Sequence, residues 1–471
     1  MKSHKSIITG IIVVLYLMTF VTHSPCQEYS KARLMNRYQK TAAAITDTAM
    51  MDGHAYSMLA ELCTRIGPRL SGSPQAAAAV EWARQVMLDY GFDNVHLQPV
   101  LVPRWIRGHV EEAAIINSPS IGTVPLVIKA LGNSVGTPKT GIVAEVVEVK
   151  SLAEVKKLGK NALGKIVFYN RPMDPRLMNT FGGYGGAVDQ RTQGAIEAAR
   201  VGAVAVLVRS VTTRLDRVPH TGVMQYDEHV PKIPAAAIST VDANLLSQTL
   251  GADKKVTVRI ALDCEPKPDV ISYNVIGEIK GSELPDEIIA VGGHLDSWDV
   301  GHGAHDDGAG CVQAIEALRL IKALDLKPRR TLRAVLFMCE EFGLRGGPAY
   351  ADSVKLHGPR HIAAIESDRG GFTPLGFTMN ADSATYMKVK KLAPLFENIS
   401  ADYFTIGGDG PDISPLRPLG TTTIGLLVDF HRYFDYHHSA NDVLEAVNER
   451  ELELGAVAMA LLGYFIAMEG L

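Results

Sequence analysis

From about residue 268 to the C-terminus, apolar strands alternate with helices, and this pattern constrains the fold more than any other feature. The strand candidates are residues 272–279, 287–292, 331–338, 361–366 and 422–428. Several are nearly uninterrupted apolar runs, which is typical of strands buried on both faces. Helical stretches such as 308–324 lie between them. The alternation predicts an α/β fold with a mostly parallel central sheet flanked by helices.

One further α/β unit is expected near the N-terminus, after a helical lead-in that reaches about Ile45. Ser73 and Pro74 favour the start of a helix, because serine caps helix N-termini and proline fits the first turn. Gly91 is a natural end for that helix. A β-like stretch, residues 95–102, follows it.

Residues from about 108 to 262 show a different pattern. Short strands are expected at 141–149 and 165–169, a glycine-rich loop at 182–186, and a helix at 192–201 that leads into a strand at 203–208. No residue cluster in this segment looks catalytic. We therefore expect a self-contained inserted domain at residues 108–265, which divides a catalytic domain into residues 27–107 and 266–471.

The first 26 residues have the order of a secretory signal peptide. Lys2 and Lys5 precede an apolar run at 7–21, and small or polar residues follow it. The run is shorter than the ~20 apolar residues that a membrane span usually needs. The residues before Cys26 fit a lipoprotein signal poorly. We expect residues 1–26 to be removed, no stable membrane span, and a secreted protein, either extracellular or periplasmic.

Composition narrows the chemistry that the chain can use. The formal net charge is −4 and no block of Lys and Arg stands out, so nothing favours nucleic acid as a partner. The five cysteines are scattered and show no CxxC spacing, which excludes a disulfide scaffold. A metal site in this chain would therefore have to use His, Asp and Glu.

Acidic and histidine-bearing segments lie at or just after the ends of the predicted strands. They are His294-Leu295-Asp296, Asp306-Asp307, Glu340-Glu341, Asp368 and, after the last strand, His437-His438. The carboxyl ends of parallel strands meet at one edge of a sheet, where open α/β folds form their sites. Segments far apart in sequence should therefore converge there.

Two histidines with several carboxylates suit zinc, or a related metal such as cobalt or manganese, and suit calcium poorly. A pair of metal ions needs one bridging carboxylate and two further protein ligands for each ion. The chain offers enough candidates. Chemistry alone does not separate His437 from His438, and Asp307 could replace Asp306.

The motifs Gly292-Gly293-His294-Leu295-Asp296-Ser297, Asp306-Asp307-Gly308-Ala309-Gly310, Glu340-Glu341, Glu366-Ser367-Asp368 and His437-His438-Ser439 resemble the M28 family of zinc peptidases. Their order and the inserted segment are most similar to its carboxypeptidase Q branch. The resemblance covers essentially the whole mature chain. The inserted domain resembles a protease-associated domain.

The resemblance implies that five residues bind two Zn²⁺ ions: Asp306 between both ions, His294 and Asp368 at one, and Glu341 and His438 at the other. It also implies that Glu340 is the general base and that Asp296 holds the imidazole of His294. The family pattern further predicts a cis peptide bond between Asp306 and Asp307.

The adjacent residues Glu340 and Glu341 can serve one site only if the chain leaves strand geometry near Gly343, because neighbours on a strand point to opposite faces. His302 and His305 are interpreted as loop residues. The segment 407–412 resembles a substrate-side loop of the family, although a simple turn would also explain it.

The resemblance implies a metallo-exopeptidase that cleaves dipeptides or short peptides near a free terminus, with peptide as its partner. Which terminus is trimmed stays open, and a homodimer is allowed without independent evidence from the residues. Two alternatives remain: a glutaminyl cyclase-like acyltransferase that uses one zinc on the same fold, and a non-catalytic, receptor-like relative.

Overall fold

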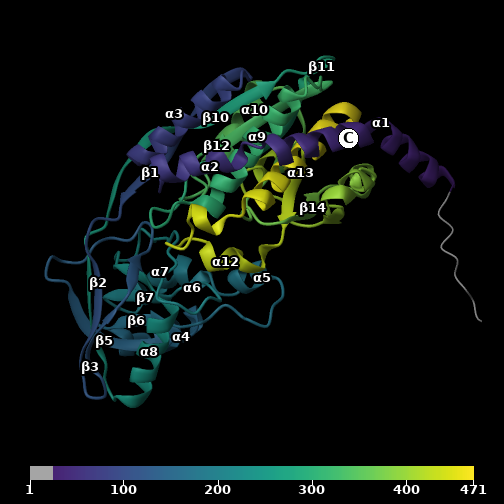
Figure 1. The fold of residues 1–471 in the computed structure, drawn as a ribbon. Coiled ribbons are helices and arrows are strands. Elements are labelled where there is room, and N and C mark those ends of the chain that lie inside the picture. Colours follow the sequence, from purple (N-terminus) through teal and green to yellow (C-terminus); the bar gives the residue numbers. More distant parts are fainter. Residues whose placement is uncertain (1–24) are drawn as a thin grey trace, which may run out of the picture.

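The computed structural model describes the backbone of residues 25–471 and the side chains of residues 33–471 except His357. The signal peptide expected at residues 1–26 lies outside the described residues, apart from its last two positions. The described chain forms two lobes, each built on an eight-stranded sheet (Figure 1).

The first sheet contains the strands that alternate with helices in the C-terminal half. Its strands, in spatial order, are β1 (Asp93–Ile106), β10 (Glu265–Ile279), β12 (Arg330–Phe337), β11 (Leu284–His294), β13 (Arg360–Glu366), β16 (Thr422–Val428), β14 (Pro374–Asn380) and β15 (Tyr403–Ile406). The four central strands β12, β11, β13 and β16 are mutually parallel. The predicted mostly parallel sheet is therefore confirmed, while β14 and β15 were not predicted from the sequence.

The second sheet, which we call the inserted sheet, is formed by strands between β1 and β10 in the sequence. In spatial order they are β3 (Gly122–Leu126), β2 (Glu111–Ser118), β9 (Thr257–Leu262), β5 (Ile142–Val149), β6 (Ile166–Tyr169), β7 (Ala205–Arg209), β8 (Ala235–Ile238) and β4 (Ile128–Ala130). Since β1 and β10 pair antiparallel, they carry the chain out of the first sheet and back into it. The prediction of an inserted second domain is confirmed, and its limits of 108 and 265 stay a prediction.

Helices cover both faces of the first sheet. They are α1 (Pro25–Asp52), α2 (Ala55–Glu61), α3 (Pro74–Asp89), α9 (Ala309–Ala323), α10 (Gly346–His357), α11 (Ser383–Lys390), α12 (Tyr433–Tyr436) and α13 (Glu449–Glu469). Successive residues of β12 show the two faces, since Leu336 joins the core on the α9 and α13 side while Phe337 contacts Tyr350 of α10. Alternation of side chains along the strand explains why residues 334–337 of β12, which are buried on both faces, are all apolar.

The inserted sheet has its own helices and its own apolar core. They are α4 (Leu152–Leu158), α5 (Thr180–Gly185), α6 (Asp189–Thr192), α7 (Gly194–Arg200) and α8 (Thr240–Ala252). The prediction of a glycine-rich loop at 182–186 is wrong, because most of this segment lies in α5. The side chain of Asn179 caps this helix by accepting the Gly182 N–H at 3.3 Å, and Phe181 packs edge-on against Phe434 of α12.

The local signals near the N-terminus are confirmed. Ser73 accepts the Ala76 N–H at 3.0 Å and Pro74 opens α3. Gly91, which follows the helix, has a φ of 67°, a conformation that glycine adopts at low cost.

Helix α13 is the one described helix that is long and apolar enough to cross a membrane. However, 89% of its most apolar window is buried inside the protein, where it packs against α1, α9 and the first sheet. Its hydrophobicity is therefore explained by its place in the core.

Candidate active site

The predicted site residues converge at one edge of the first sheet. His294 is the last residue of β11, Glu340 and Glu341 follow β12, Asp368 follows β13, and the His437–His438 pair follows β16 and α12. Because these four strands are parallel, their carboxyl ends lie at the same edge, as the sequence pattern predicts.

A first cluster contains His294, Asp306 and Asp368. The His294 Nε2 atom lies 3.2 Å from Asp306 Oδ1 and 3.6 Å from Asp368 Oδ1. One ligand atom from each of the three residues lies within 4.8 Å of the others. Burial alone would lower the pKa of His294, but the two carboxylates raise it well above its usual value, which shows how negative this cluster is.

A second cluster shares Asp306 with the first. The His438 Nε2 atom lies 3.5 Å from Asp306 Oδ2 and 2.7 Å from Glu341 Oε2. His437 Nε2 lies 3.9 Å from Asp306 Oδ2. His438 therefore contacts two of the predicted ligands, which favours it over His437. Desolvation lowers the pKa of His438 well below its usual value, and a neutral imidazole is the form that binds metal.

The unsatisfied atoms of the site fit a cation. Asp306 Oδ2 and Glu341 Oε1 are buried and accept no hydrogen bond. Desolvation, reinforced by the charge of Asp306, raises the pKa of Glu341 well above its usual value. Buried carboxylates of this kind are costly unless they are protonated, paired or bound to a metal. A donor set of imidazole nitrogen and carboxylate oxygen suits zinc.

Asp307 serves the backbone instead. Its Oδ2 atom accepts the His294 N–H at 3.0 Å and its Oδ1 atom accepts the Gly310 N–H at 2.9 Å. Both oxygens are therefore engaged, which leaves Asp306 as the better candidate ligand. The peptide bond between Asp306 and Asp307 is cis, as expected.

Asp296 supports the site differently from the expectation. Its backbone carbonyl oxygen, rather than its carboxylate, lies nearest to His294 Nδ1, at 2.9 Å against 3.8 Å. The carboxylate accepts the N–H groups of Cys339 and Glu340 at 2.7 and 3.1 Å. Asp296 thus orients the imidazole through its main chain and holds the turn that carries the glutamates through its side chain.

That turn lets Glu340 and Glu341 face one site. Strand β12 ends at Phe337, and Cys339 has a positive φ of 73°. The expected departure from strand geometry is confirmed, and it begins before Gly343. Glu341 Oε2 accepts a hydrogen bond from Trp298 Nε1 at 2.6 Å.

The side chain of Glu340 is half-buried and lines the cavity beside the two clusters. Desolvation raises its pKa well above the usual value, and the charges of Asp368 and Asp412 reinforce this shift against the opposing effect of His294. A carboxylate with a raised pKa is suited to taking up and releasing a proton near neutral pH.

Asp442 positions the segment before Asp306, and sequence reasoning missed it. Its Oδ1 atom accepts the N–H groups of Ala304 and His305 at 3.1 and 2.7 Å, and its Oδ2 atom accepts that of Asp306 at 3.1 Å. His305 stacks on Phe372 with ring centroids 4.2 Å apart, so it is a structural residue. The only available signal for Asp442 was its closeness in sequence to the two histidines.

The segment 407–412 packs beside the end of β13. Asp409 pairs with Arg417, and Glu366 at the end of β13 accepts the N–H groups of Asp412 and Ile413 at 3.4 and 2.9 Å. Contact of this segment with substrate stays a prediction.

The site opens into a cavity of about 450 Å³ that both lobes line. The first lobe contributes Asp306, Glu340, Glu341, Gly343, Leu344, Asp368, Tyr433, Phe434, His437 and His438, and the inserted lobe contributes Phe181, Tyr184, Arg191, Val223 and Gln225. The inserted segment, in which no cluster looked catalytic from the sequence, therefore forms part of the wall of this cavity.

Hydrogen bonds to the segment around the histidine pair hold the inserted lobe in place. Thr212 Oγ1 donates to the Phe434 carbonyl at 2.6 Å, and His220 Nδ1 lies 2.7 Å from the His437 carbonyl. The Thr221 N–H donates to the His438 carbonyl at 2.9 Å. Figure 1 shows α5, α6 and α12 together where the lobes meet.

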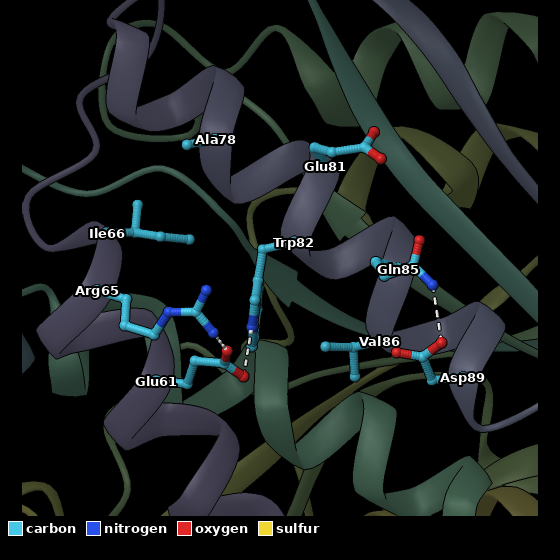
Figure 2. A pocket seen from close by; sticks show the side chains of 9 residues that line it. All are labelled: Glu61, Arg65, Ile66, Ala78, Glu81, Trp82, Gln85, Val86 and Asp89. Atoms are coloured by element: carbon cyan, nitrogen blue, oxygen red, sulfur yellow. Dashed lines mark hydrogen bonds and ion pairs between the residues drawn. The ribbon is translucent and has the colours of Figure 1, made fainter.

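A second hollow, of about 620 Å³, lies between α3 and the segment that follows α2 (Figure 2). Trp82 Nε1 donates to Glu61 Oε2 at 3.1 Å, and Arg65 pairs with the same carboxylate. None of the predicted site residues lines this hollow. It is larger than the cavity at the sheet edge but lacks its cluster of histidines and carboxylates.

Comparisons with known proteins point to one peptidase family. The model of peptidase family M28 matches residues 274–462. Carboxypeptidase Q of Bos taurus is 38% identical over 428 residues, which cover 91% of this chain and 88% of the relative. Carboxypeptidase Q of Homo sapiens is 38% identical over 413 residues, which cover 88% and 85% of the two chains.

Solved structures similar to this chain are also peptidases. A peptidase M28 precursor from Shewanella amazonensis superposes with a TM-score of 0.88 at 37% identity, covering 93% of this chain and 98% of that one. A zinc aminopeptidase from Bacillus subtilis has a TM-score of 0.65 at 20% identity over 89% and 96% of the two chains, which shows a shared fold. The chain belongs to peptidase family M28 and is a metallo-exopeptidase similar to carboxypeptidase Q.

Proposed function

We propose that the protein is a dinuclear zinc exopeptidase that hydrolyses dipeptides or short peptides near a free terminus. The observation that carries the proposal is the position of Asp306, whose two oxygens face different clusters. Oδ1 lies 3.2 Å from His294 Nε2, and Oδ2 lies 3.5 Å from His438 Nε2. A carboxylate shared in this way is what a two-metal site requires.

In this proposal five residues would hold the two ions: Asp306, with His294 and Asp368 from the first cluster and Glu341 and His438 from the second. When bound, the two ions would lower the pKa of a water molecule and polarise the carbonyl of the scissile bond. Asp307, Asp296 and Asp442 hold the backbone from which these ligands project.

Glu340 would act as the general base. Its carboxylate lines the cavity next to Asp306 and Asp368 without being one of the ligands. It would take the proton of the attacking water and pass it to the nitrogen of the leaving amine. Its raised pKa supports both transfers, because the carboxylate has to hold the proton between them.

The size of the cavity supports a short substrate. Its volume of about 450 Å³ is bounded on one side by the inserted lobe, so a long peptide has little room on that side. The names of the relatives refer to opposite termini, since one is a carboxypeptidase and another an aminopeptidase. We therefore leave the trimmed terminus to experiment.

A panel of free and end-blocked dipeptides, assayed with and without a chelator, tests the proposal. We expect hydrolysis of short peptides with a free terminus, loss of activity with chelator, and recovery when zinc is restored. Release of ammonia from peptides with an N-terminal glutamine, without hydrolysis, would instead indicate the cyclase-like acyltransferase. Absence of turnover together with absence of bound metal would indicate a non-catalytic relative.

We also propose that the chain is exported and that residues 1–26 are removed. The basic and apolar stretches of the N-terminus support this. Mass spectrometry of the mature protein from the medium or periplasm would give its N-terminus. A lipid on Cys26 would contradict the proposed cleavage.

A further inference from the structure

Arg191, on α6 of the inserted lobe, is a buried cation without an acidic partner. Its exposed fraction is 5%, and it lines the cavity that contains Glu340 and the candidate ligands. No carboxylate among the described residues forms an ion pair with it. The acidic residue nearest on its own helix, Asp189, pairs with Arg171 instead. A buried charge without a counter-charge is costly, so an arginine in this position calls for an explanation.

Neutral groups hold the guanidinium of Arg191. Nη1 donates to the Thr221 carbonyl at 3.2 Å and Nη2 donates to the Tyr184 hydroxyl at 2.6 Å. The guanidinium also lies over the Tyr184 ring, 5.5 Å from its centroid. These contacts fix the guanidinium without neutralising it, and they leave the buried Nε atom without a hydrogen-bond partner.

The carboxylates of the metal clusters do not supply the missing charge. The imidazole of His438 stands between Arg191 and Glu341, since its Nδ1 atom lies 3.3 Å from Arg191 Nη1 and its Nε2 atom lies 2.7 Å from Glu341 Oε2. Arg191 thus brings a positive charge to the cavity from the inserted lobe, while the acidic residues that follow β12 and β13 line it from the first lobe.

We propose that Arg191 binds a carboxylate of the peptide substrate and thereby selects for acidic groups at the inserted side of the cavity. Arginine suits this task because its planar group donates to both oxygens of a carboxylate. The carboxylate can be the C-terminal α-carboxylate or an acidic side chain of the residue beyond the scissile bond. The inference rests on the proposed peptidase function, and it assigns selectivity to the inserted lobe.

The test compares three substrates on the zinc-loaded full-length chain. Alanyl-leucine offers an α-carboxylate, alanyl-leucine amide offers none, and alanyl-glutamate α-amide offers only a side-chain carboxylate. Arg191→Gln should lower kcat/KM for the preferred carboxylate substrate by about 10- to 100-fold, the scale of a charge-assisted hydrogen bond. It should leave kcat/KM for alanyl-leucine amide within about threefold of the wild type.

Two further variants keep the test interpretable. Arg200→Gln makes the same change on α7, where Arg200 pairs with Glu197 and Asp227 outside the cavity, and should leave the ratio between acid and amide unchanged. Arg191→Lys keeps the charge and should retain part of the preference, which covers the case that Arg191→Gln does not fold. Zinc content is measured for every variant and should match the wild type.

The outcomes distinguish the role of Arg191 in substrate selection from the proposed peptidase function. An equal loss on acid and amide substrates, accompanied by lower zinc content, would show that Arg191 only positions His438 and would overturn the inference while leaving the peptidase function intact. An unchanged acid-to-amide ratio in Arg191→Gln would also overturn it. If the zinc-loaded wild type cleaves none of the three substrates, the proposed function fails and the inference fails with it.

Discussion

The two sheets have the same number of strands but contribute to the cavity in different ways. The first sheet brings candidate ligands to the ends of four parallel strands. Acidic side chains bind the backbone N–H groups of His294, Asp306 and the turn before Glu341. The inserted lobe contributes none of the candidate ligands. It lines the cavity instead with the aromatic side chains Phe181 and Tyr184 and with the cation Arg191. We infer from this difference that the first lobe carries the catalytic residues and that the inserted lobe contributes to substrate selection.

The largest effect is expected where both clusters meet. Asp306→Asn removes the shared carboxylate and should lower zinc content and reduce kcat/KM by more than about 1,000-fold, because metal ions supply several kcal/mol of transition-state stabilisation. Elemental analysis and dipeptide assays measure both. Asp286→Asn, an exposed change at the other end of β11, is the control. Full zinc content and activity in Asp306→Asn would show that Asp306 is not a shared ligand.

Glu340→Gln should separate metal binding from proton transfer. The variant should keep its zinc and lose at least about 100-fold in kcat, the lower scale for a lost general base. The comparison with Asp306→Asn matters, because only Asp306→Asn should lose metal. Near-normal turnover in Glu340→Gln would refute the assigned role.

The contribution of the first sheet could be predicted from the sequence because it depends on short-range sequence patterns. Apolar strands alternate with helices, and His294, Glu340 and Asp368 follow strands that must end at one edge. The finer use of each group could not be predicted. The carboxylate of Asp296 holds the Cys339–Glu340 turn, which depends on how two strand ends meet in space.

The contribution of the inserted lobe could not be predicted for a physical reason. Arg191 and Tyr184 belong to a lobe that Thr212, His220 and Thr221 join to the backbone around the two histidines. Such contacts leave no periodic signal in the sequence. The glycines of α5 likewise predicted a loop, because glycine is a poor helix former, yet tertiary packing overrides that preference.

A smaller effect tests how Arg191 is held. Tyr184→Phe removes the hydroxyl that accepts from Arg191 Nη2 and should reduce the preference for carboxylate substrates over their amides by about three- to tenfold, the scale of one hydrogen bond. Tyr226→Phe makes the same change elsewhere in the inserted lobe, where the hydroxyl donates to Ile233, and should leave this preference unchanged. An effect of equal size in both variants would mean that the loss reflects stability alone.

A last effect, on stability and with no change expected in activity, concerns an acidic residue of the first lobe that lies away from the cavity. Glu453 on α13 accepts the Tyr56 N–H at 3.0 Å, while its other oxygen has no partner. Desolvation, together with the charge of Glu316, raises its pKa to about 7. The folded protein therefore binds this proton more tightly than the unfolded chain, so the contribution to stability is present below about pH 4.5 and is lost as pH rises through about 7.

Glu453→Gln should remove this pH dependence, because glutamine keeps the acceptor and carries no charge. Relative to the wild type, the free energy of unfolding of the variant should improve by up to about 2–3 kcal/mol between pH 5 and pH 8. Urea unfolding at both pH values measures the difference, and peptidase activity at saturating zinc should not change. An identical pH dependence in the two proteins would contradict the pKa assigned to Glu453.

The proposed function depends on Asp306, which would serve two metal ions at the edge of the first sheet. The most direct test is titration of the metal-free protein with zinc, with bound zinc and dipeptide hydrolysis followed on the same sample. We predict that full activity is reached at two zinc ions per chain and that Asp306→Asn binds less and stays inactive. A metal-free preparation with full activity would contradict the account.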